Sequence, residues 1–229
     1  MRPLASVGGR VTILLVVAVL LTGCGAPEAE TAARPLAPAS PAAAIPAALT
    51  DEGLDLRAGP VAVPLELQLP SLSVTAPVLG VGITPKNVMD APMGPAGDPV
   101  WQQAFWYRGS AIPGELSTAL IAGHVGGPKG SSAVFADLDR LGPGDPIVVH
   151  DTRSGLDVRF AVTESKTYSL DQAAEPAVLN QIYGAGPVAG EWPQPSADGL
   201  SHLTLVTCTG TFRNGTHDHR LVVYATRTA

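Results

Sequence analysis

The chain has 229 residues, a formal net charge of −6 and 45% hydrophobic residues. This charge gives no basic footprint for nucleic acid, so we expect no nucleic-acid partner. The 25 glycines and 22 prolines favour tight turns between short elements and argue against long helices.

Residues 1–24 have the pattern of a bacterial lipoprotein signal. Arg2 and Arg10 precede an apolar run at 11–21, which is shorter than the roughly 20 residues of a membrane span. Residues 21–24 read Leu-Thr-Gly-Cys and look like a lipobox, in which cleavage precedes a cysteine that receives lipid. We expect residues 1–24 to be a signal peptide and Cys24 to be a lipid anchor to the membrane. The alternative is an ordinary signal or anchor helix.

A tether and one domain are expected after the signal. Residues 25–63 are rich in Ala and Pro and carry almost no periodic array of large apolar residues. Such a segment cannot bury enough surface to fold, so we interpret it as a flexible tether, with a structured lobe as the alternative. Residues 64–229 are long enough for one domain with a sizeable core.

Short apolar runs separated by turn residues predict a mainly β domain with mostly antiparallel strands. A barrel or a sandwich is expected. Two short helices are expected at 133–141 and 171–183. The predicted strands are 65–69, 72–78, 105–107, 119–122, 146–150, 158–162, 203–207 and 221–225.

Cys208 is the main candidate for a catalytic residue, because it ends a β-branched run at 203–208. The chain has only two cysteines. If Cys24 is lipidated or removed, Cys208 is an unpaired thiol outside the cytoplasm, where such a thiol is a liability unless it is used. An inert buried cysteine and a disulfide with Cys24 are the alternatives.

Two further residues complete a possible acyl-transfer site. His124 ends the apolar run at 120–124, and Arg220 opens the run at 220–225. With Cys208 they supply a thiolate nucleophile, an imidazole for proton transfer and a fixed cation for a developing oxyanion. Only the fold can bring the three together.

The order and sequence of these segments resemble the sortases. Residues 204–208 read Thr-Leu-Val-Thr-Cys and match the sortase signature Thr-Leu-x-Thr-Cys, while 122–124 look like its histidine segment and 220–223 like its arginine strand. Residues 105–107, 133–138 and 142–145 are similar to the actinobacterial class E and class F subgroups, with class F closer. The resemblance implies a closed eight-stranded sortase-type β-barrel with short helices.

The resemblance also implies an activity. A sortase of this kind cleaves an LPxTG-like sorting signal between Thr and Gly, and transfers the protein to an amine of a cell-wall precursor on the outer face of a Gram-positive type envelope. Cys208 forms the thioacyl enzyme, His124 moves the protons, and Arg220 binds the oxyanion or the substrate backbone. No cofactor is expected. Sortases are usually held by an uncleaved helix, so a lipid on Cys24 is a departure from the family.

Residues beside the nucleophile are candidates for substrate binding, namely Thr207, Val206 and Val222. Strand alternation places Val206 with Cys208 and Val222 with Arg220 on a groove face. It places Thr207 on the core side, where packing and hydrogen bonding around the nucleophile is its expected role. The segment 171–199 corresponds to the sortase loop that borders the substrate groove, and we expect it to shape specificity.

Several alternatives remain open at this level. His217 and His219 lie close to Arg220 in sequence and are alternative bases or modifiers of the site, and Arg213 is an alternative cation. No metal is expected, because a closed zinc site needs four ligands and the sequence has no pair of neighbouring cysteines. A lipoprotein that is catalytically weak or inactive and uses the barrel to bind a peptide or a partner is the alternative function.

Overall fold

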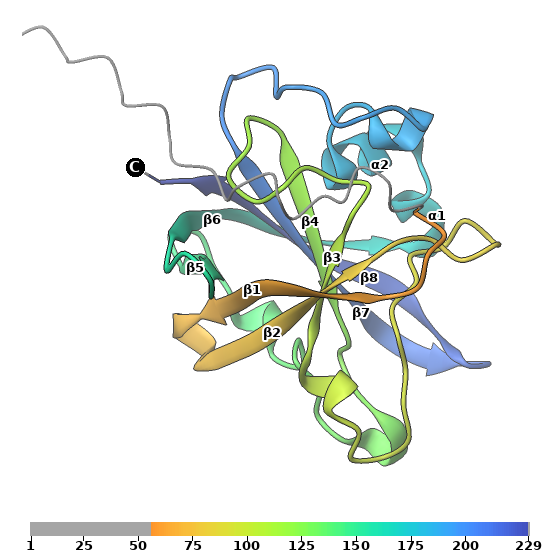
Figure 1. Ribbon diagram of the computed structural model, residues 1–229. Coiled ribbons are helices and arrows are strands. Elements are labelled where there is room, and N and C mark those ends of the chain that lie inside the picture. Colours follow the sequence, from red (N-terminus) through yellow and green to blue (C-terminus); the bar gives the residue numbers. More distant parts are fainter. Residues whose placement is uncertain (1–55, 229) are drawn as a thin grey trace, which may run out of the picture. The chain divides into compact units, whose positions relative to one another are not determined.

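Eight strands and a few short helical segments make up the computed structural model, which describes residues 56–228 (Figure 1). The signal, Cys24 and most of the proposed tether lie outside the described residues. The two α-helices are α1 (Leu170–Ala173) and α2 (Pro176–Tyr183). The strands are β1 (Val61–Leu69), β2 (Val74–Val81), β3 (Ala104–Tyr107), β4 (Thr118–Gly123), β5 (Pro146–Asp151), β6 (Asp157–Ser169), β7 (His202–Arg213) and β8 (Thr216–Arg227).

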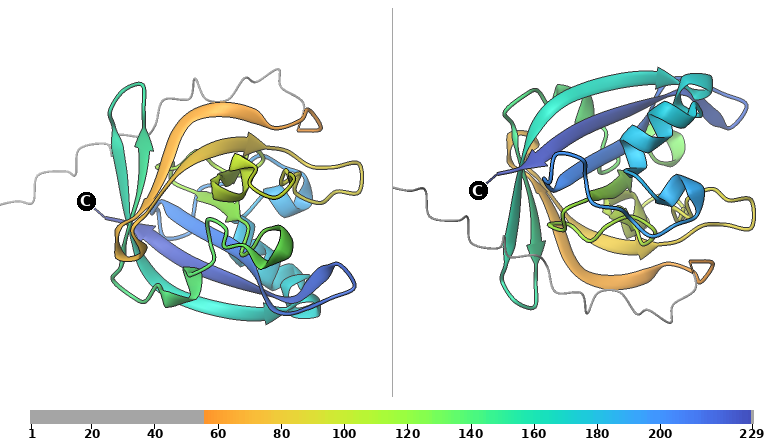
Figure 2. Two further views of the ribbon diagram at one scale, coloured as in Figure 1. Left: turned by 90° about the horizontal axis from the view of Figure 1, so that it is seen from below. Right: turned by 90° about the horizontal axis from the view of Figure 1, so that it is seen from above.

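The strands close into a barrel in the order β1-β2-β3-β4-β7-β8-β6-β5. Figure 2 shows them curving around one interior. The closed eight-stranded barrel confirms the predicted mainly β fold. Most neighbours are antiparallel, as expected, but β2 pairs with β3 and β4 pairs with β7 in parallel. The second parallel pair matters most for the site, because it brings the end of β4 beside β7.

The inner face of the strands forms the main core. Leu203 and Leu205 of β7 and Val223 of β8 are fully buried there, in a cluster with Trp106 of β3. Alternate residues of each strand point to opposite faces, so the intervening residues lie on the outside of the barrel. Trp106 satisfies its indole N–H by donating to the carbonyl oxygen of Ala111 at 3.0 Å. Burial of these side chains fixes which face of β7 and β8 looks outward.

A second cluster covers part of the outer face. Ile182 of α2 packs with Leu120 of β4, Tyr107 of β3 and Val222 of β8. All four are at most 8% exposed. The helix α2 therefore lies over the outer surface of these strands, and Figure 1 shows it next to α1 outside the barrel.

The two predicted helices differ from what the structure contains. The prediction for 133–141 is wrong, since this stretch forms successive turns with bonds to the third preceding residue and a short 3-10 segment at Leu138–Arg140. The backbone N–H groups of Val134 and Phe135 instead donate to carbonyl oxygens of other segments. The prediction for 171–183 gave one helix where there are two. Pro176 is the first residue of α2, and a proline disfavours helical backbone in the residue before it.

The N-terminal edge of the barrel lies near the end of the proposed tether. Strand β1 begins at Val61 and includes three residues that the sequence analysis placed in the tether. In the range 56–228, no helix has the length and apolar character needed to cross a membrane.

Candidate active site

The parallel register between β4 and β7 sets the position of His124. The pairing is regular from Thr118 opposite His202 to Ala122 opposite Val206. Continuing this register by two residues brings His124, which directly follows β4, beside Cys208. The two residues are far apart in sequence, and the parallel pairing alone makes them neighbours.

The antiparallel register between β7 and β8 sets the position of Arg220. Cys208 and Arg220 are direct partners across this pair. Opposite residues of an antiparallel pair project from the same face of the sheet. His124, Cys208 and Arg220 therefore lie in one row across three neighbouring strands, at the outer face. Of the three residues that the sequence analysis selected, the structure pairs Cys208 with Arg220 and places His124 directly after the strand that pairs with β7.

Thr207 joins β4 to β7 beneath this row. Its side chain is on the inner face and only 3% exposed, and its hydroxyl donates a 2.8 Å hydrogen bond to the carbonyl oxygen of Gly123. Gly123 precedes His124, so this bond fixes the backbone from which the histidine projects. The position agrees with the core-facing role expected for Thr207 from strand alternation.

The imidazole of His124 is held by three partners. Its Nε2 lies 2.9 Å from the carbonyl oxygen of Pro92. A carbonyl oxygen can only accept, so Nε2 carries the proton in the neutral ring and Nδ1 keeps a lone pair for proton transfer. The rings of Trp101 and Phe105 lie 4.8 and 5.2 Å from the imidazole, centroid to centroid.

Trp101 also holds the loop that carries this carbonyl. Its indole N–H donates to the carbonyl oxygen of Pro95 at 2.9 Å. The backbone of Asp98 also donates to Pro95, and the Asp98 side chain accepts from Val100. Sequence analysis missed Pro92 and Trp101, because no local pattern shows which loop meets the histidine.

Cys208 has a partly exposed side chain and forms no disulfide within residues 56–228. It lies on the outer face with Val206, which is also partly buried. A thiol at this position can meet a peptide that approaches from outside the barrel. Of the three residues proposed for substrate binding, Val206 keeps some exposed surface, while Thr207 and Val222 are 3% and 0% exposed.

The guanidinium of Arg220 is anchored at one nitrogen. Its Nη1 donates to the carbonyl oxygens of His219 at 2.9 Å and His217 at 3.3 Å. Within residues 56–228, Nε and Nη2 make no hydrogen bond, so the edge of the fork that carries both of them is available. Two parallel N–H groups on one edge suit a carboxylate-like or oxyanion partner.

A cavity of about 490 Å³ is lined mainly by apolar side chains on the outer face of the barrel. Tyr107, Met89 and Ile83 line it, together with Tyr183 of α2. Val206 packs against the same cluster of side chains as these four residues, two positions before Cys208. Val206 is thus the residue of this cluster that is nearest to Cys208 in sequence on β7.

The other histidines have partners of their own. His150 contacts Asp157, and His202 contacts Asp198 and Thr226. In the hairpin, His217 lies against Phe212 and His219 pairs with Asp218. Among the residues that the structure describes, no group of three or more His, Cys, Asp or Glu side chains is arranged to hold a metal ion.

Comparisons with known proteins give one family match. A family described as Sortase domain matches residues 67–228. Sortase A from Corynebacterium diphtheriae, in a lid mutant, is 20% identical, with 76% of this chain and 73% of that chain covered and a TM-score of 0.49. Sortase C-1 from Actinomyces oris is 19% identical, with coverages of 74% and 76% and a TM-score of 0.48. The pilus-related sortase C of Group B Streptococcus is 19% identical, with coverages of 73% and 68% and a TM-score of 0.47. No curated protein matches the chain.

Proposed function

The chain belongs to the sortase family, and we propose that it is a cysteine transpeptidase that cleaves an LPxTG-like sorting signal between Thr and Gly and transfers the protein to an amine of the cell wall. Sortases are in general cysteine transpeptidases that attach sorting-signal proteins to the envelope of Gram-positive bacteria. The observation that carries the proposal for this chain is the pairing of Cys208 with Arg220 across β7 and β8, with His124 directly after β4, the parallel neighbour of β7.

In the first step the thiol of Cys208 gives its proton to His124, and the sulfur attacks the threonyl carbonyl carbon. The oxygen of that carbonyl becomes an oxyanion, which the Nε–Nη2 edge of Arg220 is suited to bind. The tetrahedral intermediate collapses as the C–N bond to glycine breaks. The proton on His124 goes to the leaving amine, which leaves a thioester on Cys208.

In the second step an amine of a cell-wall precursor attacks the thioester carbon. His124 takes a proton from the incoming amine, and the oxyanion forms again beside Arg220. The C–S bond breaks, and the thiol of Cys208 is restored with the proton from His124. The tautomer set by the Pro92 carbonyl supports this role, because it leaves Nδ1 as the basic atom of the neutral imidazole.

We propose that the apolar residues of the sorting signal bind in this cavity. Its lining by Tyr107, Met89 and Tyr183 suits leucine and proline side chains, and Val206 packs in the cluster that includes these residues. We propose that Val206 contacts the substrate directly. Thr207 and Val222 are buried, so we propose structural roles for them. Thr207 holds the end of β4, and Val222 packs in the outer cluster. Within the segment 171–199, the residues that line the cavity lie between Leu179 and Glu191, and we expect these residues to set specificity.

We propose the sortase subgroup and the membrane anchor from the sequence. Residues 105–107, 133–138 and 142–145 favour the class E and class F subgroups, with class F closer. The lipobox at residues 21–24 favours a diacylated Cys24 as the anchor at the outer face of the membrane, with the Ala- and Pro-rich tether before the catalytic domain.

The proposal is tested with the full chain, purified in detergent, on fluorescent peptides that vary each position of the LPxTG motif. Each peptide is incubated with and without an added glycine-peptide amine, and products are separated by chromatography. We expect cleavage between Thr and Gly, and a joined product when the amine is present. If no peptide is cleaved while Cys208 resists thiol reagents in the folded protein, the chain is a binding module instead.

The assignment of the base is tested in the same assay. His124→Ala should lower kcat/KM more than His217→Ala or His219→Ala, since only His124 continues the β4 register to Cys208. A larger loss in either hairpin variant would transfer the role of base to that residue.

A further inference from the structure

The hairpin between β7 and β8 contains a bulge that begins two residues after the nucleophile. The ladder is regular through Thr209 opposite His219, and it resumes at Phe212 opposite His217. Gly210 and Thr211 of β7 therefore share a single partner, Asp218 of β8. Bulges of this type bend a strand and redirect the side chains beside it.

Gly210 is required at this bulge for two reasons. Its φ of +81° lies in the left-handed region, where side chains are disfavoured. A Cβ at this position would also lie 2.2 Å from Oδ1 of Asp218 and 2.7 Å from Nδ1 of His219. The missing side chain leaves the room that the Asp218–His219 pair occupies.

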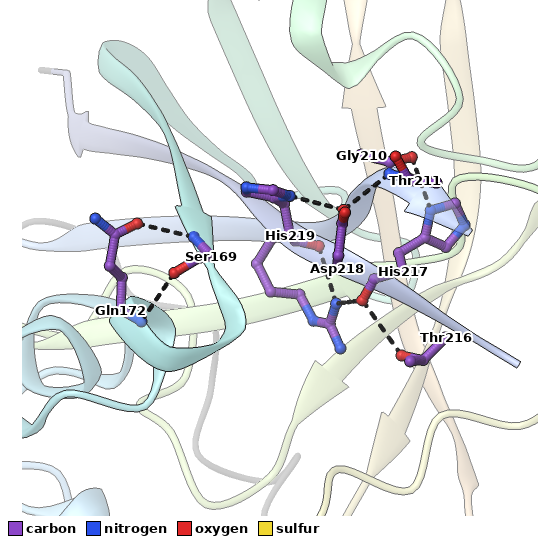
Figure 3. A network of polar contacts seen from close by, with 9 residues as sticks. Ser169, Gln172, Gly210, Thr211, Thr216, His217, Asp218 and His219 are labelled. Carbon is purple, nitrogen blue, oxygen red and sulfur yellow. Dashed lines mark hydrogen bonds and ion pairs between the residues drawn. The ribbon is translucent and has the colours of Figure 1, made fainter. Parts of the chain in front are cut away.

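Asp218 holds the bulge closed through two hydrogen bonds. Its Oδ1 accepts from the backbone N–H of Thr211 at 2.8 Å and from Nδ1 of His219 at 2.7 Å. Figure 3 shows the carboxylate between the two groups. The hydrogen bond from His219, with that from Thr211, keeps the pKa of Asp218 below its usual range, so the carboxylate is ionised at neutral pH.

The two residues that flank Asp218 provide the anchor for Arg220. Nη1 of Arg220 donates to the carbonyl oxygens of His217 and His219. The His217 backbone is held in turn by its own ring, which packs against Phe212 and reaches the carbonyl oxygen of Gly210 at 3.4 Å. The bulge thus sets the direction of the two carbonyl groups on which the guanidinium rests.

We propose that Asp218 is a positioning residue for Arg220. By holding the bulge, Asp218 fixes the carbonyl groups of His217 and His219, and these fix Nη1 so that the Nε–Nη2 edge faces the acyl group on Cys208. The inference rests on the proposed transpeptidase function. It adds that the orientation of the oxyanion donor depends on a carboxylate that touches neither the substrate nor the thiol.

The chain contains a matched control for this carboxylate. Asp198 also accepts from a backbone N–H, that of Leu200 at 3.0 Å, and from a histidine, His202 at 3.1 Å. His202 opens β7, six residues before Cys208, so this pair lies roughly 20 Å from the nucleophile at about 3.3 Å per residue. Asp198→Ala removes the same kinds of contact without touching the anchor of Arg220.

Kinetics of the full chain on its best peptide test the proposal. Asp218→Ala should lower kcat/KM by about ten- to hundredfold, mainly through kcat, because the donor edge loses its orientation. Asp218→Asn keeps an oxygen acceptor for Thr211 and should recover most of the loss, and Asp198→Ala should match the parent.

In an Arg220→Ala background, Asp218→Ala should have little further effect on kcat/KM, because both substitutions remove the same function. Two results would overturn the proposal. One is an equal decrease in kcat/KM in Asp218→Ala and Asp198→Ala. The other is that Asp218→Ala lowers kcat/KM as strongly in the Arg220→Ala background as in the parent.

A spectroscopic measurement keeps this test separate from the test of the reaction. The measurement is NMR of protein labelled with ¹⁵N-arginine. The signals of Arg220 are assigned as those that disappear from the spectrum of Arg220→Ala. We expect slowly exchanging Nη protons for Arg220 in the parent and in Asp198→Ala, and fast exchange in Asp218→Ala. Unchanged exchange in Asp218→Ala would refute the positioning role even if no peptide were cleaved, whereas an inactive parent with the expected exchange would refute the transpeptidase function alone.

Discussion

Thr207 of β7 and Gly123 of β4 are joined by a buried hydrogen bond of 2.8 Å between the threonine hydroxyl and the glycine carbonyl oxygen. Cys208 follows the first residue and His124 follows the second. The bond therefore locks together the two backbone positions from which the nucleophile and the imidazole project. It also explains why a threonine, rather than an apolar residue, precedes the cysteine on the core side of the strand.

Replacing this hydroxyl should affect both stability and activity. Thr207→Val has a similar shape but leaves the buried carbonyl oxygen of Gly123 without its partner, which costs about 1–3 kcal/mol in the free energy of unfolding. We expect kcat/KM to fall as well, because His124 loses its fixed backbone. Thr207→Ser keeps a hydroxyl and is the control. Urea unfolding measures the stability, and peptide cleavage measures kcat/KM. Equal values for Thr207→Val and Thr207→Ser in both measurements would contradict this account.

Arg220→Lys tests the need for a planar donor edge. A lysine retains the charge but cannot rest one nitrogen on the carbonyl oxygens of His217 and His219 while it offers two parallel N–H groups to an oxyanion. We expect kcat to fall by roughly 10²–10³, the size of effect seen when an oxyanion donor is removed. Arg213→Lys, at the exposed tip of the hairpin, is the matched control. Near-parental kcat in Arg220→Lys would remove Arg220 from the site, and a large loss in Arg213→Lys would move the role there.

Trp101→Phe separates the two contacts that Trp101 makes near His124. Phenylalanine keeps an aromatic ring near the imidazole but loses the N–H that holds Pro95. The loss of one hydrogen bond predicts a decrease in kcat of up to about tenfold. Trp192→Phe is the control, because Trp192 is 73% exposed. Steady-state kinetics with no difference between the two variants would show that the Pro92–Pro95 loop does not position His124.

Cys24→Ala tests the proposed anchor. The apolar run at residues 11–21 is short for a membrane span, and two acyl chains would give stable attachment where a single chain gives only marginal binding. We expect the intact mass of membrane-extracted parent protein to correspond to a chain that begins at Cys24 and carries lipid. The alanine variant should lack the lipid and normal processing. An unmodified parent chain that retains residues 1–23 would instead support an uncleaved helix.

Much of the fold could be predicted because each strand has a local signature. Apolar runs bounded by glycine and proline located all eight strands, and alternation correctly placed Thr207 on the core side. The pairing of the strands has no such signature. The parallel pairing of β4 with β7 depends on how the whole barrel closes, and no local pattern of residues 118–123 distinguishes it from an antiparallel pairing.

In the candidate site, too, some residues could be predicted from the sequence and others could not. Residue chemistry and the family signature selected Cys208, His124 and Arg220, because nucleophile, base and cation are recognisable residue types. The groups that hold them are not recognisable in this way. Pro92 acts through its backbone carbonyl, which any residue has, and Asp218 acts through a bulge that becomes visible only in the register of β7 and β8. The helix predicted at 133–141 failed for a related reason, since its backbone donors bind other segments.

The central claim is that Cys208 carries the acyl group, and the mass of the trapped intermediate tests it most directly. The full chain is mixed with an excess of LPxTG-type peptide without added amine, quenched in acid and weighed, and the modified residue is located by fragmentation. The account predicts an added mass equal to the peptide through its threonine, less water, on Cys208 in the parent and no addition in Cys208→Ala. Cleavage by Cys208→Ala within tenfold of the parent rate, or an adduct on another residue, would contradict it.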